Sequence, residues 1–441
     1  MTPPAVPVPV VPVDFAAVGL VPSRAVAAAL DAVTPERAVT LLRSLLEVPS
    51  VTGTPEESEM QHRMAGRLDA LGMDTDLWRV DLPSTLLDPG FPGSEAPRDE
   101  AWGLVGSWGG GDGPTVVLNG HLDVVPTGDP AGWSRSPWSG DVHDGRVHGR
   151  GACDMKGGVA AQLLAVQVLR EAGVRLRGTV QVQSVIGEED GGLGTFATLR
   201  RGYRGDLAVV CEPTSGNVVP SCAGALTFRL TVPGRAVHAS VRTSGVDAFD
   251  KYVLVHEALR RLETTRNVSP DPLMSRYDIA YPISVGTVRA GNWVTSVPDL
   301  LIAEGRLGVA LGEPVERARQ EFEAAVGRVC AGDEWLVRHP VRVEWFGGQF
   351  ASGEGDRDGL LGGLVSRAHA ALNDGQVPER HGAPYGSDLR LLHGIGGVPT
   401  VHYGPGDVRR AHMADEYVPV NELVTVCRTL VLLVAGVCGE S

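Results

Sequence analysis

Short apolar segments alternate with amphipathic segments between residues 102 and 211, and this alternation constrains the fold more than any other feature of the chain. Runs rich in Val and Leu are typical of buried strands, whereas apolar residues spaced three and four apart are typical of helices. The pattern predicts strand 115–119, helix 156–172, strand 178–186, helix 193–200 and strand 206–211. Because strands that alternate with helices pair in parallel, we expect an α/β domain with a mostly parallel sheet flanked by helices.

The pattern changes after residue 221 and returns later. A self-contained α+β block is predicted from strand 224–233, helix 246–265, strands 283–290 and 297–309, and helix 313–331. Helices 357–373 and 420–436 then resume the α/β pattern. We therefore predict one domain interrupted by another. The predicted parts are a Pro-rich arm over 1–30, an α/β domain over 31–220 and 336–441, and an inserted domain over 221–335.

Two segments lack helical or strand periodicity. The first twelve residues contain five prolines and no basic residue, which favours an extended polyproline-like arm over a signal peptide. Residues 82–101 contain four prolines and predict a loop. Between these segments, Thr34 and Pro35 have the residue types of a helix start, and a helix is expected over about 35–47.

Charge and composition exclude several classes of function. The formal net charge of −14 would repel a phosphate backbone, so we expect no nucleic-acid partner. Six scattered cysteines without a Cys-x-x-Cys pair argue against a disulfide framework and favour a reducing, cytoplasmic location. The longest late apolar run, from Leu423 to Val437, is interrupted by Thr425, Arg428 and Thr429. We therefore expect no membrane span.

Acidic and histidine residues recur at the ends of predicted strands, where α/β sheets present their ligand sites. His121 and Asp123 follow the run TVVL and point to the same side of an extended chain, so the carboxylate could orient the imidazole. Three consecutive acids, 188–190, end another strand and indicate either a solvated loop or a bound cation. Glu212 follows a third strand, and His412 lies in a late loop. Each feature alone is weak evidence.

The segment 149–158 opens a helix and is rich in glycine. It does not fit a dinucleotide-binding turn, because Asp154 occupies the position of the third glycine and would repel a pyrophosphate. A carboxylate there suits a cation. His256 and Glu257 begin a His-Glu-x-x-His motif, but Arg260 replaces the second histidine. Taken together, two histidines and several carboxylates at strand ends match the ligands of a two-metal hydrolytic site.

A set of motifs then resembles a known family. The motifs occur in the order found in the dinuclear zinc amidohydrolases. They are NGHLDVVP, GRGACDMKGG, GEEDGG, CEPT, GRAVHAS, YGSDLR, HYGPG and AHMADEYV. That family includes acetylornithine deacetylase, succinyl-diaminopimelate desuccinylase, aminoacylase and carboxypeptidase G. The resemblance runs from about Leu41 to Leu430. It implies a metal-binding catalytic domain with an inserted lid that also forms a dimer interface.

The resemblance also implies individual roles around two divalent ions, zinc first, with cobalt or manganese as alternatives. Asp154 would bridge the ions. The remaining protein ligands would be His121 and Glu212 for one ion, and Glu189 and His412 for the other. Glu188 would be the general base for the metal-bridging water, and Asp123 would orient His121.

Further residues would contact the substrate in such a family. His238 in the inserted block matches a histidine that reaches the partner subunit's active site in a homodimer. Arg390, Gly404 and Gly406 resemble positions that hold a substrate carboxylate. Thr295 stands where the family often has asparagine, and Arg306 comes early in register for the usual arginine of the next strand. These two departures leave the substrate open.

The expected activity is hydrolysis of the amide bond of an N-acylated amino acid. A dipeptidase or carboxypeptidase is the alternative, because both reactions use the same water, base and metals. A non-catalytic binding protein on the same fold is a different class, since fold alone does not imply activity. The presence of Glu188 and of all five predicted ligands favours an enzyme.

Overall fold

The structure is a computed structural model that describes residues 20–440. It divides into two compact units. The main unit comprises the chain up to Ser221 together with Glu354–His381 and Asp388–Ser441, and the inserted unit comprises Cys222–Gly353 and Gly382–Ser387. The insertion thus begins next to the predicted boundary at residue 221, but it ends at Gly353 rather than at 335.

The main unit contains a six-stranded sheet in the order β1-β2-β6-β3-β7-β14. Its strands are β1 (Asp74–Arg79), β2 (Trp102–Gly109), β3 (Thr115–His121), β6 (Thr179–Val185), β7 (Leu207–Val210) and β14 (Thr400–His402). β6, β3, β7 and β14 pair in parallel, whereas β2 pairs antiparallel with both of its neighbours. The predicted mostly parallel sheet is confirmed as a mixed sheet in which the central strands are parallel.

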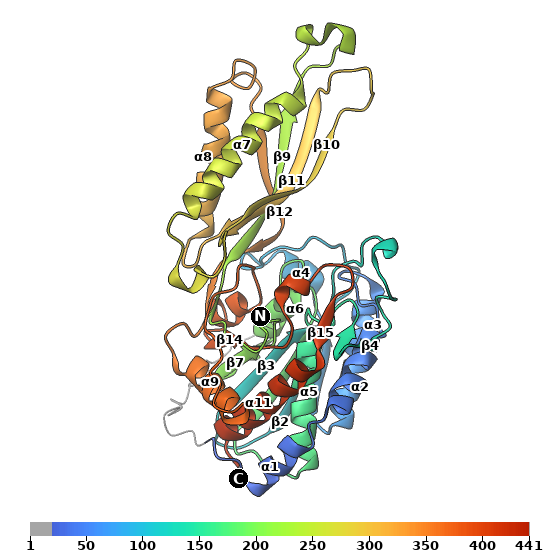
Figure 1. Ribbon diagram of the computed structural model, residues 1–441, viewed down its shortest axis with the longest axis vertical. Coiled ribbons are helices and arrows are strands. Elements are labelled where there is room, and N and C mark those ends of the chain that lie inside the picture. Colours follow the sequence, from blue (N-terminus) through green and yellow to red (C-terminus); the bar gives the residue numbers. More distant parts are fainter. Residues whose placement is uncertain (1–19, 441) are drawn as a thin grey trace. The chain divides into compact units, whose positions relative to one another are not determined.

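Helices cover this sheet (Figure 1). They are α1 (Arg24–Asp31), α2 (Pro35–Leu46), α3 (Pro55–Ala70), α4 (Leu82–Leu86), α5 (Lys156–Glu171), α6 (Leu193–Arg201), α9 (Leu360–Leu372), α10 (Leu389–Gly394) and α11 (Val420–Cys438). α5 and α11 lie side by side over β3, while α3 and α6 pack on β2 and β6. Small strands β4 (Val142–His143), β5 (Arg146–His148) and β15 (Tyr417–Pro419) form a separate sheet, and β8 (Ser221–Cys222) pairs with β13 (Gly353–Glu354).

The predicted boundary of the N-terminal arm at residue 30 is wrong. Residues 1–19 lie outside the described part of the chain, but helix α1 begins at Arg24, well before residue 30. The Ser23 hydroxyl accepts a hydrogen bond from the Val26 N–H, which satisfies one of the free donors of the first turn. Val26, Ala29 and Leu30 then face the core at helical spacing.

Helix α11 is long and apolar enough to cross a membrane by length and composition, with a mean hydropathy of 1.7 over 18 residues. However, 61% of that window is buried within the protein. The helix packs against α2, α5 and α9, and its Leu and Val side chains belong to the main core. This packing is typical of the central helix of a globular unit.

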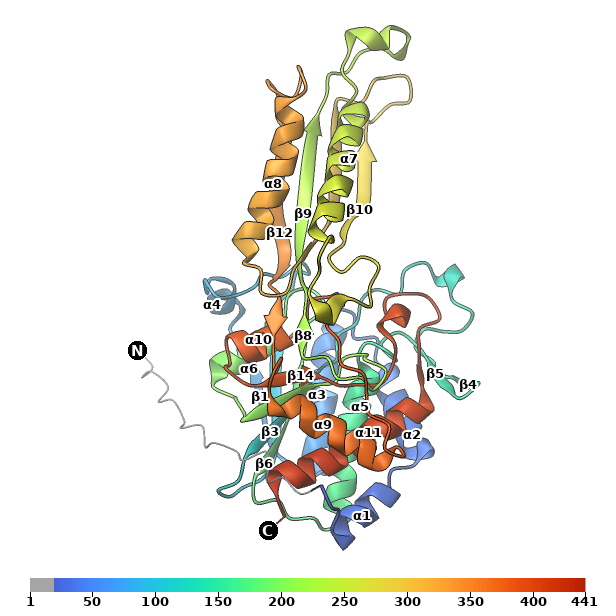
Figure 2. The same cartoon turned by 60° about the vertical axis from the view of Figure 1, so that its left-hand side comes forward.

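The inserted unit is a four-stranded antiparallel sheet covered by two helices (Figure 2). The order is β10 (Ile283–Ala290), β11 (Leu300–Val309), β9 (Gly224–Pro233) and β12 (Arg342–Phe350), with α7 (Ala248–Arg266) and α8 (Val315–Ala331) side by side. Along β9, buried and half-buried residues alternate throughout, as expected for a strand with one face on a core. The predicted α+β block is therefore present.

Strand β12 explains the misplaced boundary. It pairs antiparallel with β9 and completes the sheet, so the chain remains in the inserted unit until Gly353. Its register shifts between Trp345 and Gln349, around two consecutive glycines, and this interruption hides the alternation expected of a strand. Residues 382–387 also belong to this unit. The Gly382 N–H donates to the Leu273 carbonyl oxygen, and the Gly382 carbonyl oxygen accepts a hydrogen bond from the Tyr277 hydroxyl.

Candidate metal centre

The predicted ligands follow the carboxyl ends of neighbouring parallel strands. His121 is the last residue of β3, the turn containing Glu188 and Glu189 follows β6, and Glu212 follows β7. β6, β3 and β7 are adjacent and parallel, so their carboxyl ends meet at one edge of the sheet. This topology brings together residues that are far apart in the sequence.

Asp154 lies between two histidines. It comes from the loop before α5, and His412 comes from the loop before β15. Asp154 Oδ1 is 3.2 Å from Nε2 of His121, and Asp154 Oδ2 is 3.3 Å from Nε2 of His412. His412 Nε2 is also 3.1 Å from Oε2 of Glu189. The carboxylate thus presents one oxygen to each imidazole, as expected of a ligand shared by two cations.

Two overlapping groups of ligand atoms result. Those of His121, Asp154 and Glu189 lie within 4.8 Å of one another, and so do those of His121, Glu188 and Glu212. The structure therefore brings all five predicted ligands and the predicted base into one cluster of the main unit. Glu188 lies beside His121 and Glu212 in this cluster.

The electrostatics of this cluster favour bound cations. Burial raises the pKa of Glu188 well above its usual range, and the charge of Glu212 raises it further. Burial also raises the pKa values of Glu189 and Glu212. For Asp154, burial opposes ionisation, but hydrogen bonds from the two histidines lower its pKa. The charge of Glu189 raises the pKa of His412 to about 11. Crowded, buried carboxylates repel one another, and divalent ions would relieve this repulsion.

The hydrogen bonds of His121 suit a metal ligand. Its Nδ1 lies 2.9 Å from the backbone carbonyl oxygen of Asp123, which can only accept a hydrogen bond. With Nδ1 donating to this oxygen, Nε2 is the ring atom that would bind a metal ion after losing the proton that it donates to Asp154. In addition, the buried Oε1 of Glu188 has no hydrogen-bond partner among the described residues. The imidazole and carboxylate donors fit zinc, cobalt or manganese.

Asp123 contacts His121 through two groups. Its backbone carbonyl oxygen lies 2.9 Å from Nδ1 of the ring, and its carboxylate Oδ1 lies 3.7 Å from the same atom. The two carboxylate oxygens accept hydrogen bonds from the N–H groups of Glu188 and Glu189, both at 3.2 Å, and from Thr52. Asp123 therefore holds the acidic turn in place.

Arg390 is buried rather than exposed on a helix surface. Its Nη2 donates a hydrogen bond of 2.7 Å to the carbonyl oxygen of Gly191, at the end of the same acidic turn. Nearby, the hydroxyl of Thr195 donates to the Asp388 carboxylate at 2.7 Å. One contact of Arg390 is thus with the turn, and its predicted contact with substrate stays a prediction.

Gly404 and Gly406 have packing roles. The Gly404 N–H donates to the Thr214 hydroxyl, and the Gly406 N–H donates to the Glu422 carboxylate. These amides are therefore already used and do not offer free donors to a substrate carboxylate. A Cβ on Gly406, at a φ of +91°, would also lie 2.7 Å from the sulfur of Cys153.

We expect Gly404→Ala to lower the free energy of unfolding by about 1–3 kcal/mol, as overpacking does elsewhere. Its Cβ would lie 2.3 Å from the carbonyl oxygen of Cys211 and 2.4 Å from that of Glu212. Gly66→Ala is the matched control, because Gly66 lies in helix α3 with nothing within 4 Å of the added carbon. There we expect a gain of about 0.5–1 kcal/mol. Urea denaturation measures both, and equal stabilities would contradict the packing role.

His238 and Thr295 lie together within the inserted unit. The Ala239 N–H donates to the Thr295 carbonyl oxygen at 2.8 Å, next to the exposed imidazole of His238. The ring Nδ1 accepts the Ser240 N–H at 3.2 Å. Since Nδ1 is an acceptor, a neutral ring carries its proton on Nε2 and can donate a hydrogen bond there. This tautomer is the one required of an oxyanion donor.

Several residues that support the centre were not predicted. Arg150 and Glu416 form a buried ion pair, and Glu416 also accepts the N–H groups of Cys153 and Asp154. Both residues lie within recognised motifs, but nothing in their sequence spacing indicated that they pair. Separately, within the inserted unit, burial lowers the pKa of the Arg306 guanidinium.

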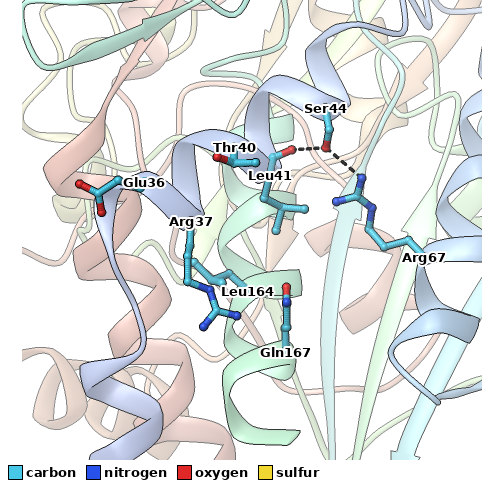
Figure 3. Close-up of a pocket in the computed structure, with 8 residues that line it drawn as sticks. All are labelled: Glu36, Arg37, Thr40, Leu41, Ser44, Arg67, Leu164 and Gln167. Atoms are coloured by element: carbon cyan, nitrogen blue, oxygen red, sulfur yellow. Dashed lines mark hydrogen bonds between the residues drawn. The ribbon is translucent and has the colours of Figure 1, made fainter. Parts of the chain in front are cut away.

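A separate pocket of about 420 Å³ lies among helices α2, α3 and α5 (Figure 3). Arg37 and Arg67 line it, and Arg67 donates to the Ser44 hydroxyl at 2.9 Å. Arg37 forms an ion pair with Glu171. None of the predicted site residues lines this pocket. It is therefore distinct from the metal centre.

A buried cluster of two imidazoles and four carboxylates at the ends of parallel strands defines the metal-dependent hydrolases as the class of this protein. Comparison with known proteins identifies the family. The sequence pattern of peptidase family M20/M25/M40 matches residues 117–436, and the chain belongs to this family. It is a hydrolase that cleaves amide bonds.

Two curated relatives cover nearly the whole chain. N-formyl-4-amino-5-aminomethyl-2-methylpyrimidine deformylase of Bacillus subtilis (strain 168) is 27% identical over 92% of this chain and 95% of its own. Succinyl-diaminopimelate desuccinylase of Bradyrhizobium sp. (strain ORS 278) is 34% identical over 89% of this chain and 96% of its own.

Among solved structures, the Bacillus subtilis YXEP protein, a dinuclear metal binding peptidase from the M20 family, aligns with a TM-score of 0.58. It is 18% identical, and the alignment covers 91% of this chain and 97% of that one. At this identity the alignment supports the fold. The α/β domain with an inserted lid domain is thereby confirmed.

Proposed function

We propose that this protein removes the acyl group of an N-acylated amino acid by hydrolysing its amide bond with two divalent ions. The observation that carries the proposal is Asp154 placed between His121 and His412, beside Glu188, whose buried Oε1 lacks a hydrogen-bond partner among the described residues. His121 and Glu212 would hold one ion, Glu189 and His412 would hold the other, and Asp154 would contribute to both. The deformylase and desuccinylase names of the two relatives favour a deacylase over a peptidase.

The chain's own residues supply binding and proton transfer. When bound, the two ions would polarise the scissile carbonyl and lower the pKa of the attacking water. Glu188 accepts the proton of that water and delivers it to the departing amine. Asp123 keeps Glu188 in place through the Glu188 N–H.

Arg306 is a candidate for binding an anionic group within the inserted unit. Its guanidinium donates to the carbonyl oxygen of Pro384 at 3.2 Å and has no carboxylate partner within residues 20–440. A buried cation of this kind is stabilised by an anionic ligand, and its planar fork suits a carboxylate.

A substrate panel tests the proposal. N-acetyl, N-succinyl, N-formyl and N-carbamoyl amino acids, dipeptides and an N-formylated amine without a carboxylate would be assayed with zinc, cobalt or manganese. We expect kcat/KM to be highest for one of the N-acyl amino acids. Preference for dipeptides would make the protein a peptidase, and preference for the uncharged amine would remove the substrate carboxylate from the proposal.

We further propose that the protein is a cytoplasmic homodimer and that His238 donates from its Nε2 to the oxyanion of the partner's substrate. A single oxyanion donor is worth about 10²–10³-fold in kcat, so we expect His238→Ala to lower kcat by that factor with metal content unchanged. His339→Ala is the control, because His339 stacks on Trp335 elsewhere in the inserted unit.

Mixing two inactive variants tests whether His238 acts across subunits. A mixed dimer of His238→Ala and Glu188→Gln chains would contain one site with both an intact base and an intact histidine. We expect partial recovery of activity after subunit exchange. No recovery after proven exchange, or a monomeric active enzyme, would contradict the arrangement.

A further inference from the structure

A buried ionic cluster outside the predicted ligand set surrounds Arg98, in the segment between α4 and β2 that the sequence marked only as a loop. The cluster, here called the Arg98 clamp, comprises Arg98, Glu57 and Asp190. Their side chains are 3%, 3% and 6% exposed, respectively. Charged groups this deeply buried are retained only where they are paired.

The guanidinium of Arg98 binds both carboxylates through its two edges. Its Nε and Nη2 donate to Glu57 at 2.9 and 3.1 Å, while its Nη1 and Nη2 donate to Asp190 at 2.9 and 3.1 Å. Burial would lower the pKa of Arg98, but the hydrogen bonds to Glu57 and Asp190 raise it above its usual value. Only the planar fork of arginine can satisfy two carboxylates in this geometry.

The two carboxylates flank the acidic turn. Oε1 of Glu57 accepts the N–H of Gly187 at 3.2 Å, directly before Glu188. Asp190, directly after Glu189, also accepts the N–H groups of Glu95 and Ala96 at 3.1 and 2.8 Å. The clamp therefore holds the turn on both sides of the base and of one metal ligand.

We propose that Arg98 is a positioning residue that fixes the Glu188–Glu189 turn for metal binding and proton transfer. The part of this inference that concerns proton transfer by Glu188 rests on the proposed function. The part that concerns metal binding depends only on the cluster of ligand atoms described above. Loss of the guanidinium would leave Glu57 and Asp190 as buried carboxylates without their cation, and the turn would move with them. Residues that orient metal ligands are typically worth 10–100-fold in metal affinity or activity.

Arg98→Met and Arg98→Lys test the proposal in the full chain, with Co²⁺ alone as the probe. We expect Arg98→Met to weaken Co²⁺ binding by about 10–100-fold, to change the visible absorption of the bound Co²⁺, and to lower kcat more than it changes KM. Arg98→Lys keeps the charge but cannot bind both carboxylates at once. The values for Arg98→Lys should therefore lie between those of wild type and Arg98→Met in each measurement. If Arg98→Met does not fold, Arg98→Lys alone tests the proposal.

Arg266→Met is the matched control. Arg266 is 5% exposed and binds two glutamates, Glu313 and Glu321, within the inserted unit. It should lower thermal stability while leaving the Co²⁺ affinity and spectrum unchanged. If the Arg98 and Arg266 variants lose stability alike and neither changes Co²⁺ binding, spectrum or kcat, the positioning role is overturned. If wild type cleaves no substrate in the panel, the proposed function fails, while the Co²⁺ measurements still decide for or against the clamp.

Discussion

Replacement of Glu188 by Gln is expected to lower kcat by about 10²–10⁴-fold while two metal ions remain bound. The amide has nearly the same shape as the carboxylate but cannot take a proton from water. Glu188 is 6% exposed and its Oε1 has no hydrogen-bond partner within the described chain, so its carboxylate is available for this transfer. Steady-state kinetics and elemental analysis of the same preparation measure the two quantities.

Glu304→Gln is the control for this substitution, because Glu304 pairs with Arg229 in the inserted unit. We expect its kcat to stay near that of wild type. Near-normal turnover of Glu188→Gln would show that Glu188 is not the base. Loss of one ion from Glu188→Gln would instead make Glu188 a ligand, which its closeness to His121 and Glu212 permits.

Removal of the metal ions is expected to lower turnover to the uncatalysed background, and two equivalents of zinc, cobalt or manganese per chain should restore it. The cluster holds four carboxylates whose mutual repulsion cations relieve. Since the ions bind the folded chain, each should also raise the free energy of unfolding by about 2.7 kcal/mol at a concentration one hundred times its Kd. Chelation with back-titration and thermal unfolding with and without metal test both effects.

Asp154→Asn should abolish the binding of both ions, because one carboxylate oxygen faces each histidine and an amide has only one such oxygen. Asp76→Asn is the comparison, since Asp76 pairs with Arg201 and Tyr203 away from the cluster. It should bind two ions as wild type does. Full turnover in metal-free protein, or a single ion bound by wild type, would contradict the dinuclear centre.

Three candidate ligands could be placed from the sequence because His121, Glu189 and Glu212 each lie at or just after the end of a strand whose own residues mark it. His121 follows one apolar run and the turn with Glu188 follows another. Both runs form strands in the structure, β3 and β6. Parallel strands present their carboxyl ends at one edge of a sheet. An α/β fold class therefore already predicts that residues at these strand ends lie close together. Local periodicity is set by residues a few positions apart, which a sequence displays directly.

The supporting contacts could not be predicted, because they join distant residues without a local pattern. Arg98 and Asp190 are 92 positions apart, and Arg150 and Glu416 are 266 positions apart. The same holds for β12, whose interrupted register is recognisable only beside β9. Asp123 illustrates the limit within a motif: its spacing suggested the contact with His121, but not that its carboxylate also accepts the N–H groups of a turn 65 and 66 residues later.

The sequence by itself determined most helices and strands of the main unit, the interrupted α/β architecture and a set of residues able to bind cations, because these depend on local hydrophobic periodicity and residue chemistry. The tertiary structure alone decided which atoms of those residues face one another and which buried ions hold them. Such contacts depend on long-range packing. The buried Arg98, for example, is stabilised by the carboxylates of Glu57 and Asp190, and neither is near it in the sequence.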